Sequence, residues 1–210
     1  MNKLLKYGFL VLFAAMVFWG GWLLFHPEEK GTLHVVLDPG HGGEDPGAMV
    51  GEAAEKDIDL AIALLVREQL EGQEGISVSM TREEDIFISL DDRAEFANRE
   101  EADLYVSIHA NALENDESFA GIFTFYHPDK KTSKAPAKTI QAAVTASSGG
   151  IDRGIRSADY AVLRQTDMPA VLVETGFMTC PDELAMLLDP DYQLLLAQGI
   201  AQGILKCDLR

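Results

Sequence analysis

A run of nineteen uncharged residues at positions 7–25 most constrains what this chain can fold into. As a helix it would be about 28 Å long, which is close to the thickness of the hydrocarbon layer of a membrane. Lys3 and Lys6 precede the run, and cationic residues there favour a cytoplasmic N-terminus and export of the remaining chain. The sequence therefore predicts an N-terminal transmembrane helix, with residues 1–30 as signal anchor and short linker and residues 31–210 as one folded domain.

A cleaved signal peptide is the alternative interpretation of the same run. The run is long for the apolar part of a signal peptide, and no small-x-small cleavage site comes after it. Trp19 and Trp22 lie near its outer end, where indole rings favour the membrane interface. We therefore expect a single-pass protein of the cell membrane with its domain on the outer side, and a secreted domain as the alternative.

The charge of the chain excludes one class of partner. Among 210 residues, 34 are acidic and 17 are basic, so the formal net charge is −17. Residues 1–30 hold three lysines and two glutamates, so the remaining domain is slightly more acidic, at −18. Such a surface repels phosphates, and we expect no nucleic-acid partner. Apolar residues make up 47% of the chain, which suffices for the packed core of one domain.

Strand-like apolar runs alternate with amphipathic helical patterns along residues 32–205. The predicted strands span residues 32–37, 76–80, 104–108, 121–126 and 170–173, and the predicted helices span residues 55–70, 90–98, 135–146 and 192–205. This alternation is typical of an α/β fold. We expect a mixed, largely parallel sheet with helices on both faces, in which ligands bind outside the carboxyl ends of the strands.

Histidine and glutamate side chains lie at the predicted carboxyl-end edge of the sheet. His41 follows the first strand, His109 follows a central strand, Glu174 follows the last strand, and Glu55 begins the first helix. Two histidines and one carboxylate with an open position form a common ligand set of catalytic zinc. His41, Glu55 and His109 therefore predict a zinc site, and Glu174 would be free to transfer a proton of water.

Each of these residues also has a structural explanation. Glu55 could stabilise the positive end of a helix dipole. Glu174 could pair with Arg164, and the two histidines could be ordinary hydrogen-bonded residues of a loop and of the core. If Glu55 is not a ligand, Glu52 and Asp45 are the plausible substitutes.

Ordered blocks along residues 33–206 match the motifs of a known family. They include residues 37–43, 45–48, 55–57, 80–82, 106–111, 153–155, 160–164 and 168–177. In these blocks the chain resembles the zinc-dependent N-acetylmuramoyl-L-alanine amidases of the type 3 cell-wall hydrolase family.

The resemblance implies one zinc ion bound by His41, Glu55 and His109, with Glu174 as the catalytic glutamate. It implies a peptidoglycan hydrolase. Such an enzyme uses a zinc-bound water to cleave the amide bond between the lactyl group of N-acetylmuramic acid and the L-alanine of the stem peptide.

Asn111 and Arg156 are weaker candidates for substrate contacts. A guanidinium pairs with carboxylates such as those of stem peptides, but a loop hydrogen bond and a solvated surface charge would explain the two residues equally well.

The chain departs from the family pattern in two places. Cys180 occupies a position where the family usually has asparagine, and only residues 112–120 separate Asn111 from Gly121. Some Gram-negative members of the family carry a long helical insertion after the second histidine, which blocks the active site until an activator binds. The short segment here argues against this form of autoinhibition.

Two other classes of function stay open at the level of sequence. One is a non-catalytic peptidoglycan-binding or regulatory module that kept the fold, and the other is a different zinc hydrolase, such as a wall-sugar deacetylase. The biological role is equally open among wall turnover, cell separation and sporulation. In a spore-cortex role, a partner deacetylase is expected.

Overall fold

A computed structural model of the chain describes residues 32–114 and 116–209. The predicted signal anchor at residues 7–25 lies outside these residues and stays a prediction. Among the helices of the described residues, none combines the length and the apolar composition that crossing a membrane requires.

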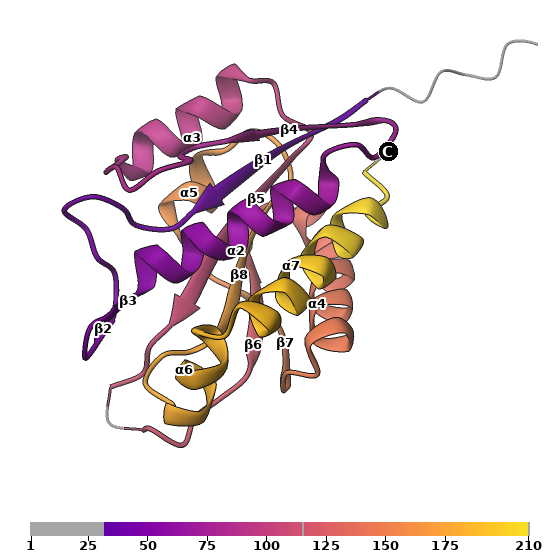
Figure 1. The fold of residues 1–210 in the computed structure, drawn as a ribbon. Coiled ribbons are helices and arrows are strands. Elements are labelled where there is room, and N and C mark those ends of the chain that lie inside the picture. Colours follow the sequence, from indigo (N-terminus) through magenta and orange to yellow (C-terminus); the bar gives the residue numbers. More distant parts are fainter. Residues whose placement is uncertain (1–31, 115, 210) are drawn as a thin grey trace, which may run out of the picture. The chain divides into compact units, whose positions relative to one another are not determined.

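Six strands form the central sheet in the order β4-β1-β5-β8-β6-β7 (Figure 1). They are β1 (Leu33–Pro39), β4 (Ile76–Met80), β5 (Leu104–Asn111), β6 (Ile122–Tyr126), β7 (Asp152–Ser157) and β8 (Ala170–Phe177). Neighbouring strands pair in parallel except β6 and β8, which pair antiparallel. The expected mixed, largely parallel sheet is thus confirmed. A separate two-stranded hairpin joins β2 (Met49–Val50) to β3 (Ala53–Ala54).

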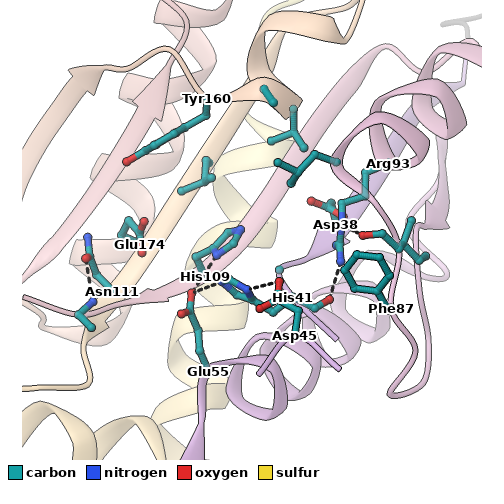
Figure 2. Close-up of a pocket in the computed structure, with 17 residues that line it drawn as sticks. Asp38, His41, Asp45, Glu55, Phe87, Arg93, His109, Asn111, Tyr160 and Glu174 are labelled. Carbon is teal, nitrogen blue, oxygen red and sulfur yellow. Dashed lines mark hydrogen bonds and ion pairs between the residues drawn. The ribbon is translucent and has the colours of Figure 1, made fainter. Parts of the chain in front are cut away.

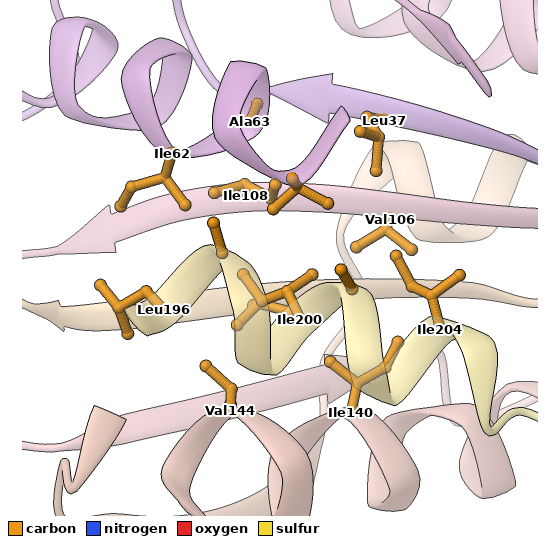
Figure 3. Packing of buried hydrophobic residues seen from close by; sticks show 14 of the residues in the cluster. Leu37, Ile62, Ala63, Val106, Ile108, Ile140, Val144, Leu196, Ile200 and Ile204 are labelled. Carbon is orange, nitrogen blue, oxygen red and sulfur yellow. The ribbon is translucent and has the colours of Figure 1, made fainter. Parts of the chain in front are cut away.

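Helices cover both faces of the sheet, as the sequence predicts. They are α2 (Glu55–Leu70), α3 (Leu90–Arg99), α4 (Lys134–Ser148), α5 (Ala161–Gln165), α6 (Pro181–Leu187) and α7 (Pro190–Leu205), with the 3-10 turn η1 (Lys131–Ser133) before α4. The larger apolar core lies under α2, α4 and α7 and includes Ile62, Ile140 and Ile200 of these helices together with Ile108 of the sheet (Figure 3). A smaller core forms around Tyr105 and Leu163 on the side of α3 and α5.

Two glycines of α7 set the close approach of α7 to α4. A Cβ atom on Gly199 would lie 2.5 Å from Cα of Val144, and one on Gly203 would lie 2.6 Å from Cα of Ile140. Real Cβ atoms do not come so near to backbone, so these positions require glycine if the two helices keep their distance.

Two strands extend further than their apolar pattern indicates. The sequence predicts that β5 ends at residue 108 and β8 at residue 173, whereas β5 ends at Asn111 and β8 at Phe177. Ladder pairing between the two strands continues through His109 and Glu174, so these residues lie within strands and not after them. The parallel neighbours supply hydrogen-bonding partners there, which a single strand's hydropathy does not reveal.

Strand alternation places the polar residues on one face of the sheet. Successive side chains of a strand point to opposite faces, and residues paired across strands share a face. Asp38 pairs with Ser107, and Glu174 pairs with His109 on one side and with Phe123 of β6 on the other. These side chains therefore line the face that α3 and α5 cover, at the carboxyl ends of the parallel strands.

Candidate metal centre

Two buried arginines hold the loop that begins at the end of β1 and carries His41. Arg82 donates hydrogen bonds to the carbonyl oxygens of Pro39 (3.2 Å) and Gly40 (2.6 Å). Arg93 donates to those of Pro39 (2.6 Å) and His41 (2.5 Å). Together the guanidinium groups fix three successive carbonyls, and they hold His41 at a φ of 55°, a conformation uncommon outside glycine.

A buried ion pair anchors one of these arginines to the sheet. Arg93 lies 2.7 Å from Asp38 Oδ1, and Asp38 also accepts hydrogen bonds from Thr81 (2.6 Å), Tyr105 (2.5 Å) and Ser107 (2.8 Å). Burial by itself would raise the pKa of Asp38, but Arg93 and the hydroxyl donors hold this pKa below its usual value. The carboxylate thus stays ionised and keeps the arginine in place.

His41, Glu55 and His109 converge from the loop, the start of α2 and β5 (Figure 2). Glu55 Oε1 lies 2.9 Å from Nδ1 of His109 and 3.1 Å from Nε2 of His41. Burial opposes ionisation of Glu55, yet its hydrogen bonds with both histidines lower its pKa to about 2. One charged oxygen therefore faces two imidazole nitrogens.

The substitute ligands expected from the sequence lie elsewhere. Asp45 Oδ2 is 2.8 Å from Nδ1 of His41, on the ring edge opposite Glu55, so it orients the imidazole from behind. Burial lowers the pKa of His41, but Glu55 and Asp45 more than offset this and leave the pKa raised. Glu52 is exposed in the turn between β2 and β3.

Glu174 stands beside this group as the ladder partner of His109 in β8. Its side chain is buried, and within the described residues Oε2 has no hydrogen-bond partner. Burial raises the pKa of Glu174 to about 7, and the Glu55 carboxylate contributes to this rise, while His109 and His41 oppose it. The alternative pairing of Glu174 with Arg164 does not occur, because Arg164 pairs with Asp159.

Asp59 is a residue of this site that sequence reasoning missed. It lies one helical turn after Glu55 on the buried face of α2, and His41, Glu55, Asp59 and His109 each bring one nitrogen or oxygen within 4.8 Å of the others. The available signal was a second carboxylate four residues after Glu55, next to Ile58 and Ile62 of the apolar face.

The chemistry of these donors fits a divalent metal ion. Imidazole nitrogens with carboxylate oxygens are the usual ligands of zinc. Asp59 and Glu174 also leave buried carboxylate oxygens without partners among the described residues, which costs free energy unless a cation lies near. His41, Glu55 and His109 could hold such an ion, with Asp59 next to them.

A cavity of about 410 Å³ opens over these residues. His41, Glu55, His109, Glu174 and Asn111 line it (Figure 2). The lining also includes largely apolar side chains, those of Phe87, Ile88, Leu90, Tyr160, Val162 and Leu172. Arg156 is not part of the lining. Its guanidinium lies over the ring of Phe123, 4.3 Å from the ring centre.

Comparisons with known proteins agree on one family. The family model of N-acetylmuramoyl-L-alanine amidases, Amidase_3, matches residues 35–206. The probable cell wall amidase LytH of Staphylococcus aureus is 37% identical over 183 residues, which are 84% of this chain and 60% of that protein.

Two solved structures share the fold. The N-acetylmuramoyl-L-alanine amidase of Clostridium difficile 630 superposes with a TM-score of 0.81 and 40% identity, covering 84% of this chain and 96% of that one. The CwlD amidase of Clostridioides difficile, solved in complex with the GerS lipoprotein, gives 0.78 and 35%, covering 83% and 97%.

The buried carboxyl of Glu174 predicts a pH-dependent stability of the metal-free protein. Its pKa is about 7 in the folded chain against 4.5 as the ordinary value, so folding disfavours the ionised form. This penalty is absent below pH 4.5, grows as the pH rises and is complete above about 7, where it reaches up to ~3 kcal/mol. Glu174→Gln should raise the free energy of unfolding at pH 8 by up to that amount and change it little near pH 4.5.

Urea unfolding in the presence of a chelator at both pH values measures the difference. Glu117→Gln, which removes an exposed carboxylate, is the control and should have no effect at either pH. An equal effect of Glu174→Gln at the two pH values would contradict the prediction.

Proposed function

The chain belongs to the N-acetylmuramoyl-L-alanine amidase family of cell-wall enzymes, and on this premise we propose how its residues cleave the muramoyl amide bond. His41, Glu55 and His109 hold one zinc ion, and Glu174 transfers the proton. The observation that carries the proposal is that Glu55 Oε1 lies within 3.1 Å of both imidazole nitrogens, while Glu174, whose Oε2 has no hydrogen-bond partner among the described residues, is the ladder neighbour of His109.

The charge and orientation of the proposed ligands support the assignment of a zinc site. Zinc bound at such a site supplies a Lewis acid, which polarises a carbonyl oxygen and lowers the pKa of water to about 7. Because the pKa of Glu55 is about 2, this residue offers a charged oxygen at any physiological pH. Asp45 keeps Nδ1 of His41 engaged and so directs Nε2 toward Glu55.

The environment of Glu174 suits proton transfer at neutral pH. A general base works best when its pKa lies near the operating pH, and the pKa of Glu174 is raised to about 7. Since Oε2 accepts no hydrogen bond within the described residues, it is free to take a proton from water. The same carboxyl then passes the proton to the departing nitrogen of L-alanine.

Asn111 and Arg156 are proposed to contact the stem peptide. Asn111 lines the cavity, and its Oδ1 accepts a hydrogen bond from Ala112 (2.8 Å), which leaves the amide NH₂ to donate. Arg156 is exposed over Phe123 and makes no ion pair with a described residue. Phe123 is the ladder partner of Glu174, so Arg156 stands above the strand next to the reacting groups, where it can pair with a peptide carboxylate.

The location of the enzyme is a separate proposal. We propose that residues 7–25 anchor the chain in the cell membrane with the catalytic domain on the outer side, because the run is long enough to span the membrane. Secretion after cleavage is the alternative. A role in the spore cortex would add a partner deacetylase, and the lipoprotein bound to the CwlD relative supports a search for a protein partner.

Muropeptide analysis tests the proposed reaction. Purified residues 31–210 loaded with zinc should release whole stem peptides with free L-alanine amino termini from peptidoglycan. Glu174→Gln should lower this rate by about 10²–10⁴-fold and keep the bound zinc, because the substitution removes the proton acceptor and no proposed ligand.

Mass spectrometry of the products, with zinc measured on the same samples, reads both outcomes, and Glu117→Gln serves as an exposed control. Full activity of Glu174→Gln would disprove the mechanism. Loss of acetyl groups from sugars that keep their peptides would identify a deacetylase, and binding to the sacculus without new amines would identify a binding module.

Substrate kinetics test the role of Arg156. Arg156→Ala should raise KM about tenfold for a stem peptide with a free carboxylate at its second residue and leave kcat unchanged, because a charged hydrogen bond is lost. The amidated substrate should show no such change. Arg99→Ala is the matched control, because Arg99 also lies over a ring, that of Phe96 on α3. Equal KM values for wild type and Arg156→Ala would exclude the contact.

Fractionation of cells tests the anchor. The full chain should remain in the membrane after an alkaline wash, with its domain open to protease added from outside. Ala15→Arg places a charge in the middle of the apolar run and should reduce membrane insertion, whereas Ala15→Leu should not. A shortened chain in the culture medium would show cleavage instead.

A further inference from the structure

Helix α2 presents two buried carboxylates to the metal centre. Glu55 and Asp59 lie four residues apart, so both point from the same face of the helix. Glu55 Oε1 is 2.9 Å from Nδ1 of His109, and Asp59 Oδ2 is 3.8 Å from the same atom. The sequence and the family motif account for Glu55 and leave Asp59 without a role.

Nothing in the described residues satisfies the Asp59 carboxylate. Its side chain is 0% exposed, and neither of its oxygens has a hydrogen-bond partner there. The carboxylates of Glu55, Glu174 and Asp38 are near enough to repel it. Burying a carboxylate in this way costs free energy, and an apolar residue at this position of α2 would avoid the cost.

The arginine whose charge attracts Asp59 is committed to other partners. This residue is Arg82. Its guanidinium donates hydrogen bonds to the carbonyls of Pro39, Gly40, Lys56 and Glu84, and none to Asp59. A carboxyl group without a hydrogen-bond partner among the described residues therefore lies beside the histidines, where either a proton or a bound cation would neutralise it.

We propose that Asp59 is the charge-balancing carboxylate of the metal centre. Asp59 would balance the charge of a bound cation from beside Nδ1 of His109, and it stays outside the ligand set of His41, Glu55 and His109. This inference rests on the proposed metal centre and not on the reaction that the centre performs.

The charges at the site support this role. The two imidazoles are neutral ligands, so Glu55 supplies only one negative charge toward a divalent cation. Asp59 supplies the second one within 4.8 Å of the ligand atoms. Glu174, the ladder neighbour of His109, then keeps an Oε2 atom without a hydrogen-bond partner among the described residues, and it can exchange a proton.

The requirement for an open coordination position argues against Asp59 as a fourth ligand. A fourth protein ligand would fill the position that a catalytic metal site keeps open for water and substrate. Asp59 Oδ2, at 3.8 Å from Nδ1 of His109, is also further from this nitrogen than Glu55 Oε1 is, at 2.9 Å.

Metal binding to Asp59→Asn tests the proposal in the full chain. This substitution keeps the size of the side chain and removes its charge. The dissociation constant for zinc, measured by competition with a chelator, should rise about 10–100-fold. Asp57→Asn is the matched control, because Asp57 is exposed on the same turn of α2, and its zinc affinity should stay within about twofold of wild type.

Thermal unfolding separates this role from a structural one. Without metal, the Tm of Asp59→Asn should equal or exceed that of wild type, because an unpaired buried carboxylate is gone. With zinc, its Tm should fall below that of wild type. Unchanged zinc affinity, or an equal loss of Tm with and without zinc, would overturn the proposal.

Cobalt spectra fix the position of Asp59 relative to the metal. With Co²⁺ bound, the d–d bands of Asp59→Asn should match those of wild type, because the ligand set is intact. Altered bands would show that Asp59 is a ligand and would overturn its placement outside the set. If Asp59→Asn does not fold, Asp59→Ala removes the same charge and should weaken zinc binding likewise.

These outcomes are independent of the proposed reaction. A wild type that binds zinc and releases no stem peptides would refute the amidase mechanism and leave the role of Asp59 intact. An active wild type whose Asp59→Asn variant binds zinc normally would refute the role of Asp59 alone.

Discussion

The buried ion pair between Asp38 and Arg93 is the interaction on which the rest of the site depends. Asp38 lies near the carboxyl end of β1, and it pairs there with Arg93 of α3. Arg93 also donates hydrogen bonds to the carbonyls of Pro39 and His41. A charged pair in this interior is favourable only because both Asp38 oxygens and all three Arg93 nitrogens have hydrogen-bond partners. The pair therefore ties one helix, one strand and the loop of His41 into a single arrangement, and Arg82 reinforces it.

The site assigns opposite tasks to two glutamates by their surroundings. Glu55 faces two imidazole nitrogens, and these hydrogen bonds lower its pKa despite its burial. Glu174 is buried without a partner for Oε2 within the described residues, and its pKa rises to about 7. One carboxyl is thereby kept as a permanent anion, while the other can gain and lose a proton near neutral pH. Burial acts on both, and the hydrogen bonds decide the difference.

Long amphipathic segments of the fold were predictable from sequence, and short polar ones were not. The predicted helix at residues 55–70 agrees with α2, because its apolar residues recur at helical spacing over sixteen residues. Strand β7 was missed because Ile155 is the single large apolar residue among its six, and because the strand lies at the sheet edge. Helix α5 has only five residues, too few for a period to show. Tertiary contacts stabilise both elements, and local propensity does not.

The sequence by itself determined the α/β alternation and the candidate set of His41, Glu55, His109 and Glu174, because apolar runs locate the strands and helices to within a few residues. The true ends of β5 and β8 lie three to four residues beyond the predicted ones. Only the tertiary structure decided that Asp45 orients His41 from behind and that Asp59 faces His109. The physical reason is that spacing along the chain fixes neighbours within one helix or strand. The distances between side chains from different elements depend on how the sheet and its helices pack.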